Sequence, residues 1–310
     1  LRPGFERRTN LRQTIMIECV PNFSEGRDLA VVRAIVDAIA SSTGVTVLGW
    51  ESDSDHHRSV VTFAGEADAV LEGAVRGVGK AAELIDLNKH VGVHPRVGAA
   101  DVVPFVPLQG STLEECAEIA HRAGAEIWKR SGVPVYFYEA AARIPERKAL
   151  QNVRRKGFDG RPPDIGDIAA HPTAGASVVG ARNFLIAYNI NLATKDIAVA
   201  KAIAEKIRES SGGFRYVKAM GLDLKTLDCA QVSMNLTNFA GIPLDELYAT
   251  VAREAEQRGT KISESELIGF VPLAAYEKAP EFFRRTRGWT ETRVIEMNIS
   301  PHRKKELHID

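Results

Sequence analysis

Two histidines stand four residues apart in residues 89–98, which read KHVGVHPRVG. On a helix, His90 and His94 would share one face and could bind zinc, but Gly92 and Pro95 argue against a helix here. Pro95 biases His94 toward an extended backbone, so a loop presents an imidazole that can titrate near neutral pH. We interpret His94 as a candidate general acid or base, with a structural or merely exposed histidine as the alternative.

A second polar segment, residues 51–58, combines carboxylates and imidazoles in the order ESDSDHHR. Its spacing matches neither a helical zinc site nor a calcium-binding EF-hand, because the glycine and the terminal glutamate of that loop are missing. We therefore predict no metal ion. Two interpretations stay open for this segment, which are a solvated turn and a loop that contacts the substrate.

The composition is that of an ordinary globular chain. It has 310 residues, of which 45% are hydrophobic and 26% charged, and 40 basic side chains balance 40 acidic ones. No global field exists to attract nucleic acid or an anionic membrane, and no apolar run approaches the roughly 20 residues of a bilayer span. The three cysteines are far apart, so we predict a reducing cytoplasm and no disulfide framework. Residues 1–15 are basic and lack periodicity, which is typical of an extension that contributes nothing to catalysis, with an Arg-rich transit peptide as the alternative.

Hydrophobic periodicity predicts the elements that would position these side chains. The expected order in the first half is a strand at 17–23, a helix at 28–41 with Asp28 as its N-cap, strands at 45–50 and 59–64, a helix at 67–87, a strand at 101–108, a helix at 113–131 and a strand at 133–138. Its core is the split βαββαβ order of a ferredoxin-like unit. Residues 156–180 then lose periodicity and indicate a linker or a functional loop.

The same order returns in the second half. We expect strands at 184–192, 217–222, 230–236 and 267–273, with helices at 196–210 and 244–258. The tetrapeptide FVPL ends the last predicted strand of both halves, at 105–108 and 270–273, which favours an internal duplication. The predicted fold is α+β, with two ferredoxin-like subdomains whose sheets face each other. The predicted boundaries are an extension at 1–15, subdomains at 16–179 and 180–286, and a tail at 287–310.

Alternation along two strands of the second half predicts one apolar and one polar sheet face. The polar face carries amides and hydroxyls rather than charges, namely Asn189, Asn191, Gln231, Ser233 and Asn235. A solvated face is one interpretation, and a hydrated cleft that binds a polar heterocycle is the other.

Three long motifs make the chain recognisable. Residues 18–26 (ECVPNFSEG), 94–107 (HPRVGAADVVPFVP) and 180–192 (GARNFLIAYNINL) together resemble the glutamate formimidoyltransferase family. The resemblance implies transfer of the formimino group from N-formimino-L-glutamate to N5 of tetrahydrofolate, a step of histidine degradation and one-carbon metabolism. It also implies that two α/β subdomains enclose tetrahydrofolate as a co-substrate.

The resemblance also implies roles for particular residues. His94 matches the catalytic histidine of the family, and Glu51 stands where animal relatives place an aspartate that assists it. The folate-binding loop maps onto Gly166, Asp167, Ile168, Ala169, Ala170, His171, Pro172, Thr173, Ala174 and Gly175. We expect tetrahydrofolate to bind on this loop and on the amide face.

The expected partners are small molecules, formiminoglutamate and tetrahydrofolate, with neither nucleic acid nor membrane. We also predict a cytoplasmic homodimer whose product passes to a separate cyclodeaminase, because the chain stops where animal relatives continue into that domain. Two alternatives stay open, a non-catalytic folate-binding relative and the transfer of a formyl group at N5.

Overall fold

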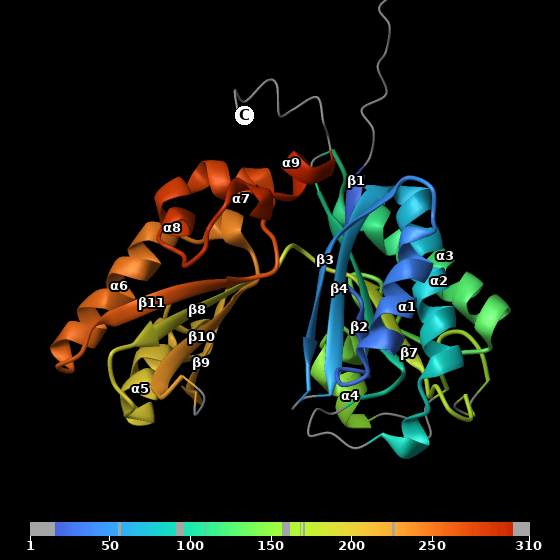
Figure 1. Ribbon diagram of the computed structural model, residues 1–310, viewed down its shortest axis with the longest axis horizontal. Coiled ribbons are helices and arrows are strands. Elements are labelled where there is room, and N and C mark those ends of the chain that lie inside the picture. Colours follow the sequence, from blue (N-terminus) through green and yellow to red (C-terminus); the bar gives the residue numbers. More distant parts are fainter. Residues whose placement is uncertain are drawn as a thin grey trace, which may run out of the picture.

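The structure is a computed structural model that describes residues 16–54, 57–90, 96–108, 110–156, 162–167, 169, 171–224 and 227–299. The predicted extension at 1–15 lies outside these residues. Two mixed α/β domains, each with its own sheet, lie side by side, and residues 182–185 cross from one to the other (Figure 1).

The N-terminal domain is built on a seven-stranded sheet. Its strands are β1 (Met16–Cys19), β2 (Asn22–Phe23), β3 (Val45–Asp53), β4 (Arg58–Glu66), β5 (Ala100–Pro107), β6 (Val135–Glu139) and β7 (Ser177–Ala181). Strand β1 lies between β4 and β5, and β3 pairs with the other side of β4. Strands β7 and β6 extend the sheet beyond β5 in parallel.

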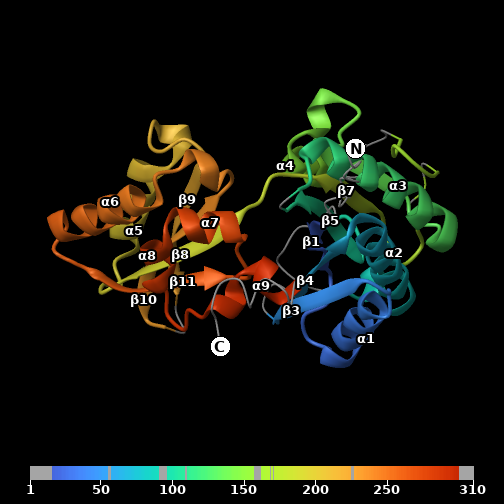
Figure 2. The ribbon, with the colours of Figure 1, turned by 90° about the horizontal axis from the view of Figure 1, so that it is seen from above.

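Helices cover one face of this sheet (Figures 1 and 2). They are α1 (Leu29–Ala40), α2 (Ala67–Leu84) and α3 (Leu113–Ser131). The short α4 (Leu150–Lys156) packs on the other face, where Val153 is buried with Tyr136 and Tyr138 of β6. The Asp28 side chain accepts from the first turn of α1, which confirms the predicted N-cap. A capping box of Thr112 and Glu115 begins α3, and Gly132 ends it with a left-handed backbone at φ 63°.

The C-terminal domain has a four-stranded antiparallel sheet with the order β11-β8-β10-β9. Its elements are β8 (Ile186–Leu192), α5 (Ile197–Ile207), β9 (Val217–Leu224), β10 (Cys229–Leu236), α6 (Leu244–Gln257), β11 (Ile262–Ile268), α7 (Leu273–Lys278), α8 (Pro280–Arg284) and α9 (Ile295–Ile299). The apolar side chains of β8 and β10 are buried with those of α5 and α6. The corresponding strands of the N-terminal sheet, β5, β1, β4 and β3, follow the same spatial order.

The end of the described chain returns to the N-terminal domain. Val294 and Ile295 are fully buried in one hydrophobic cluster with Ala64 of β4 and Val106 of β5. Figure 2 shows α9 between the two domains, beside β3 and β4. The segment predicted as a tail therefore contains a helix that helps to hold the domains together.

Several sequence-based predictions need correction. The strand expected at 267–273 is wrong, because β11 ends at Ile268, Gly269 turns the chain with φ 77°, and α7 begins at Leu273. The second FVPL therefore follows a strand rather than ending one, and it carries no argument for duplication. The irregular stretch at 156–180 contains β7. The expected loop at 51–58 is the tip of a hairpin, since β3 runs to Asp53 and β4 starts at Arg58.

Candidate active site

A cavity of about 480 Å³ lies between the two domains. One wall is the open face of the N-terminal sheet, including Glu18, Asn22 and Thr62, and the opposite wall is formed by residues 184–187 and 268–270. The volume suits a small molecule or part of a larger one. Because its walls come from different domains, the cavity exists only when both have folded and docked.

Glu18 lies on β1 at the centre of the N-terminal wall. Its neighbours Ile17 and Cys19 enter the helix-covered core, so strand alternation turns Glu18 toward the cavity. The residue is only 3% exposed. Burial raises the pKa of this carboxyl to about 8, while nearby Arg182 lowers it and Glu296 raises it further. At neutral pH, Glu18 is therefore mostly a neutral carboxylic acid.

Glu51, the predicted partner of the catalytic histidine, lies on β3 opposite Val60 of β4. Its side chain is exposed and lines the same cavity as Glu18. The two acids therefore occupy different environments, one desolvated and one in contact with water.

Three guanidinium groups supply positive charge to the cavity, from Arg58 on β4, Arg182 in the interdomain segment and Arg293 in the short 3₁₀ helix Glu291–Arg293. Arg182 Nη1 donates to Asn183 O at 3.1 Å, and Arg293 Nη1 donates to Gly269 O at 2.9 Å. Guanidinium groups bind carboxylates well, often through two parallel N–H···O bonds. The cavity can therefore receive an anionic ligand.

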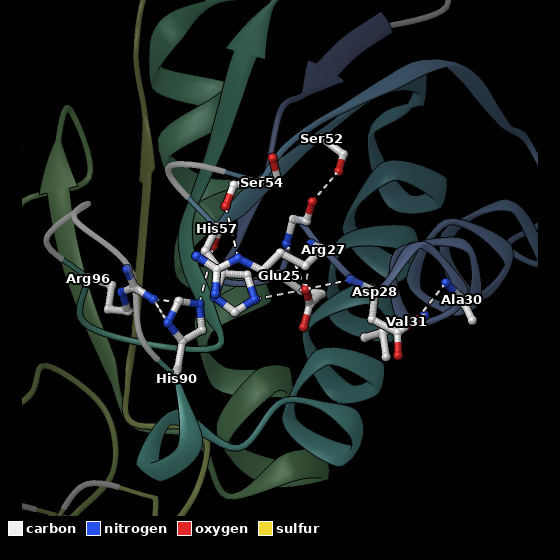
Figure 3. A network of polar contacts seen from close by, with 11 residues as sticks. Glu25, Arg27, Asp28, Ala30, Val31, Ser52, Ser54, His57, His90 and Arg96 are labelled. Carbon is white, nitrogen blue, oxygen red and sulfur yellow. Dashed lines mark hydrogen bonds and ion pairs between the residues drawn. The ribbon is translucent and has the colours of Figure 1, made fainter.

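His94 lies outside the described residues, in the stretch 91–95, but the residues on both sides of it are described. Figure 3 shows His90 and Arg96 in contact, with the His57 ring stacked on that of His90 at 3.8 Å between centroids. His57 Nε2 lies 2.9 Å from Glu25 Oε1. The network connects His90 and Arg96, which stand on either side of the stretch 91–95 (the His94 segment), to His57 at the tip of the β3–β4 hairpin. The same hairpin carries Glu51 and Arg58.

Glu25 anchors this network at the start of α1. Its Oε1 accepts from the backbone N–H groups of Gly26, Arg27 and Asp28 at 2.8 to 3.0 Å, as well as contacting His57. Burial alone would raise the pKa of this carboxyl, but the hydrogen bonds from the backbone and from His57 lower it overall. Glu25 is therefore held as a carboxylate.

Asp101 fixes the far end of the His94 segment. It is 2% exposed, its Oδ1 accepts from Val97 N at 2.6 Å, and its Oδ2 pairs with Arg154 Nη2 at 2.6 Å. The same aspartate and arginine both act on the pKa of Arg58, which burial lowers. The segment is thereby joined to β5, α4 and a residue of the cavity. The sequence-based analysis missed Asp101, although an acid beginning an apolar strand is a usable signal.

The predicted folate loop packs against the residues that flank His94. Leu87 N donates to Thr173 O at 2.8 Å, Asn88 Nδ2 donates to Pro172 O at 2.9 Å, and Ala99 N donates to Ala174 O at 2.8 Å. Gly175 has φ +68°, and a Cβ there would lie 2.4 Å from Val97 O, so the close approach requires glycine. Ile168 and Ala170 lie outside the described residues.

The amide face is present on the C-terminal sheet as predicted by alternation. Gln231 and Asn191 pair across β10 and β8, with Gln231 Nε2 donating to Asn191 Oδ1 at 2.8 Å, and both are 4% exposed. Ser233 and Asn189 form the next pair, and Asn235 lies opposite the cavity residue Ala187. The edge strands add charge that the sequence-based analysis did not place there, namely Glu264, Glu266 and Lys218.

The structure brings some predicted residues together and leaves others apart. Glu51 lines the interdomain cavity, and the loop at 171–175 adjoins both flanks of the His94 segment. The amide face begins where the cavity wall ends, but its five predicted residues do not line that cavity. Glu18 was missed, although its place between the core residues Ile17 and Cys19 was a readable signal.

Within the described part of the chain, no cluster of three or more His, Cys, Asp or Glu side chains is arranged to hold a metal ion. Nor does any helix among those residues have the length and apolar character to cross a membrane.

Comparison with known proteins adds an independent result. Residues 16–182 match the N-terminal subdomain of the formiminotransferase domain, and residues 187–301 match the formiminotransferase domain. The chain is 41% identical over 295 residues to the glutamate formimidoyltransferase of Thermoplasma acidophilum, covering 92% of this chain and 97% of that protein. It is 43% identical to that of Streptococcus pyogenes over 86% and 93% of the two chains. It is also 41% identical to the formimidoyltransferase-cyclodeaminase of Gallus gallus, covering 86% of this chain and 52% of that protein.

Proposed function

The chain belongs to the formiminotransferase family, and from this premise we propose that it transfers the formimino group of N-formimino-L-glutamate to N5 of tetrahydrofolate. The observation that carries the proposal is the match of both domains to relatives named for this activity, over nearly the whole length of each. The interdomain cavity supports it, because guanidinium groups suit a donor that carries two carboxylates.

In the proposed reaction, a bond forms between folate N5 and the formimino carbon, and the bond from that carbon to the glutamate nitrogen breaks. N5 must lose a proton and the departing nitrogen must gain one, so a single imidazole can act first as base and then as acid. His94 is the proposed shuttle. Glu51 would orient the imidazole and stabilise its protonated form.

Tetrahydrofolate is the proposed co-substrate, bound on residues 166–175 and on the amide face. The loop contacts residues 87–88 and 98–99, on either side of the proposed catalytic segment. The amides of Asn189 and Asn235 continue the wall that begins at Ala187. A reduced pterin presents donors and acceptors that amides can match.

The proposal also covers the origin of the fold, the oligomeric state and the cellular location of the protein. Two ferredoxin-like units that arose by internal duplication would explain why four strands of each sheet share one spatial order. We further propose facing sheets, a cytoplasmic homodimer, and a product that a separate cyclodeaminase consumes.

The test is turnover by the purified chain, measured as glutamate released from formiminoglutamate with tetrahydrofolate. We expect release only when both substrates are present. A protein that binds tetrahydrofolate in calorimetry but releases no glutamate would instead be the non-catalytic relative. N-formylglutamate as donor tests the other alternative, and preferential turnover of that compound would make the chain a formyltransferase.

A further inference from the structure

Glu18 has no role in the proposed mechanism, although it lines the interdomain cavity. It is the central acid on the cavity face of the N-terminal sheet, and the residues opposite it on both neighbouring strands are small or apolar, Ala64 on β4 and Val106 on β5. Both are fully buried. A carboxyl group at this position has lost most of its water, and neither neighbouring side chain can form a hydrogen bond with it. Burying a polar group in this way costs free energy, which a purely structural role would not explain.

The surroundings of Glu18 leave the carboxyl available to a ligand. The Glu18 side chain makes no hydrogen bond or ion pair with the described residues, although Arg182 is near enough to act on its charge. The group nonetheless lines the cavity. A buried acid of this kind, aimed into a cavity and without a partner in the described chain, is typical of a residue that pairs with a cationic ligand.

The charged groups that face Glu18 come from five elements. Arg182 lies on the interdomain segment and Glu296 on α9, while Glu51 of β3, Arg58 of β4 and Arg293 of the 3₁₀ helix share the cavity. Two buried groups near these charges stay neutral, since burial raises the pKa of Tyr138 to about 12 and that of Cys19 well above its usual range. The cavity therefore offers one desolvated acid among several guanidinium groups.

This arrangement complements the charges of formiminoglutamate. The donor has two carboxylates and one amidinium group, a planar cation whose N–H groups can bond a carboxylate. We propose that Glu18 binds the amidinium of the donor and thereby selects a formimino donor over a neutral formyl donor, with the guanidinium groups taking the carboxylates. The inference rests on the proposed function and assigns Glu18 a role in specificity.

Proton linkage follows from this pairing. Free Glu18 is mostly protonated at neutral pH, and an amidinium beside it stabilises the carboxylate, so donor binding releases a proton to solvent. Donor affinity should therefore rise about tenfold per pH unit below the pKa and level off above it. A neutral formyl donor gains nothing from ionisation and should release no proton.

Calorimetry of the wild-type chain tests this without any variant. Formiminoglutamate and N-formylglutamate are titrated at pH 7 in buffers of different ionisation enthalpy. We expect release of close to one proton with the first compound and none with the second. Formiminoglutamate binding without proton release would overturn the proposal, and failure of turnover with normal proton release would count against the proposed function alone.

The variant test compares Glu18→Gln with Glu139→Gln. Glu139 is a matched control, because Arg182 also acts on its charge but it does not line the cavity. We expect Glu18→Gln to raise the KM for formiminoglutamate at least tenfold, to leave the KM for tetrahydrofolate within twofold, and to abolish the preference over N-formylglutamate. The control should change none of these. Equal losses for both substrates, or a retained preference, would show that Glu18 is only structural.

Discussion

The open faces of the two sheets differ in charge and in enclosure. On the N-terminal sheet, the face carries Glu18 and Arg58 and is closed off by the second domain to form a cavity. On the C-terminal sheet, the central strands carry Asn189, Ser233 and Asn235, and Met220 on β9 is 58% exposed. Both sheets bury an apolar face under helices, so the difference lies in the faces that the helices leave open.

This difference indicates a division of roles between the domains. Charges discriminate between ligands strongly only where water is excluded, since the Coulomb energy rises as the effective dielectric constant falls. A charged donor therefore suits the enclosed face. A neutral heterocycle is recognised by several hydrogen bonds, each worth about 0.5 to 1.5 kcal/mol, which Asn189, Ser233 and Asn235 can supply because they are not buried.

The largest expected effect comes from removing the proposed proton shuttle, a change that leaves the open faces of both sheets unaltered. His94→Ala should lower kcat by about 10² to 10⁴, the usual contribution of general acid–base catalysis. Tetrahydrofolate affinity should stay unchanged, because neither the loop nor the amide face is altered. Steady-state kinetics and calorimetry measure the two effects. If the variant retained turnover within threefold of wild type, the proton shuttle would have to be another residue.

The pH dependence of stability tests the enclosure of the charged face. The Glu18 carboxyl ionises near 4.5 when unfolded and near 8 when folded, so the unfolded state loses its proton first and wild-type stability falls as pH rises between these values. Glu18→Gln lacks this loss. Between pH 5 and pH 9 the variant should gain about 4 kcal/mol relative to wild type, measured by urea unfolding. Parallel pH profiles would mean that water reaches the carboxyl.

The next prediction concerns the ion pair between Asp101 and Arg154, which supports the N-terminal domain beside the His94 segment. Asp101→Asn should lower the free energy of unfolding by about 3 to 5 kcal/mol, because Arg154 would keep a poorly paired charge. Asp68→Asn is the control, since its pair with Arg122 is exposed and worth at most about 1 kcal/mol. A loss as small as that of the control would show that Asp101 is not needed to hold the His94 segment.

Local signals explain which parts of the fold were predictable. Helix α3 begins and ends where the sequence indicates, because Thr112, Glu115 and Gly132 supply its caps and the apolar period between them is unbroken. Asp28 marks α1 in the same way. At 267–273 a continuous apolar run looked like a buried strand, but Gly269 breaks the strand and Val271 pairs only through an isolated bridge to Val294. That pairing depends on a distant segment, which periodicity cannot reveal.

The site was predictable where residue type and alternation carry the information. Strand alternation placed the amides on one face. Glu51 was singled out only by the resemblance to the family, in a segment expected to be a loop, and the structure puts it on β3 beside the cavity. Asp101 and Glu18 needed the tertiary structure. Asp101 matters through Arg154, 53 residues away, and Glu18 becomes buried only when the second domain docks over β1. Such environments arise from packing between distant segments rather than from local spacing.

The most direct test of the division between the two faces is the KM for each substrate in Arg58→Gln, Asn189→Ala and the double variant. The account predicts that Arg58→Gln raises only the KM for formiminoglutamate and Asn189→Ala only that for tetrahydrofolate, each by about tenfold, with additive effects in the double variant. If both single variants instead raised the same KM, the two faces would bind one substrate together, and the division of roles would be wrong.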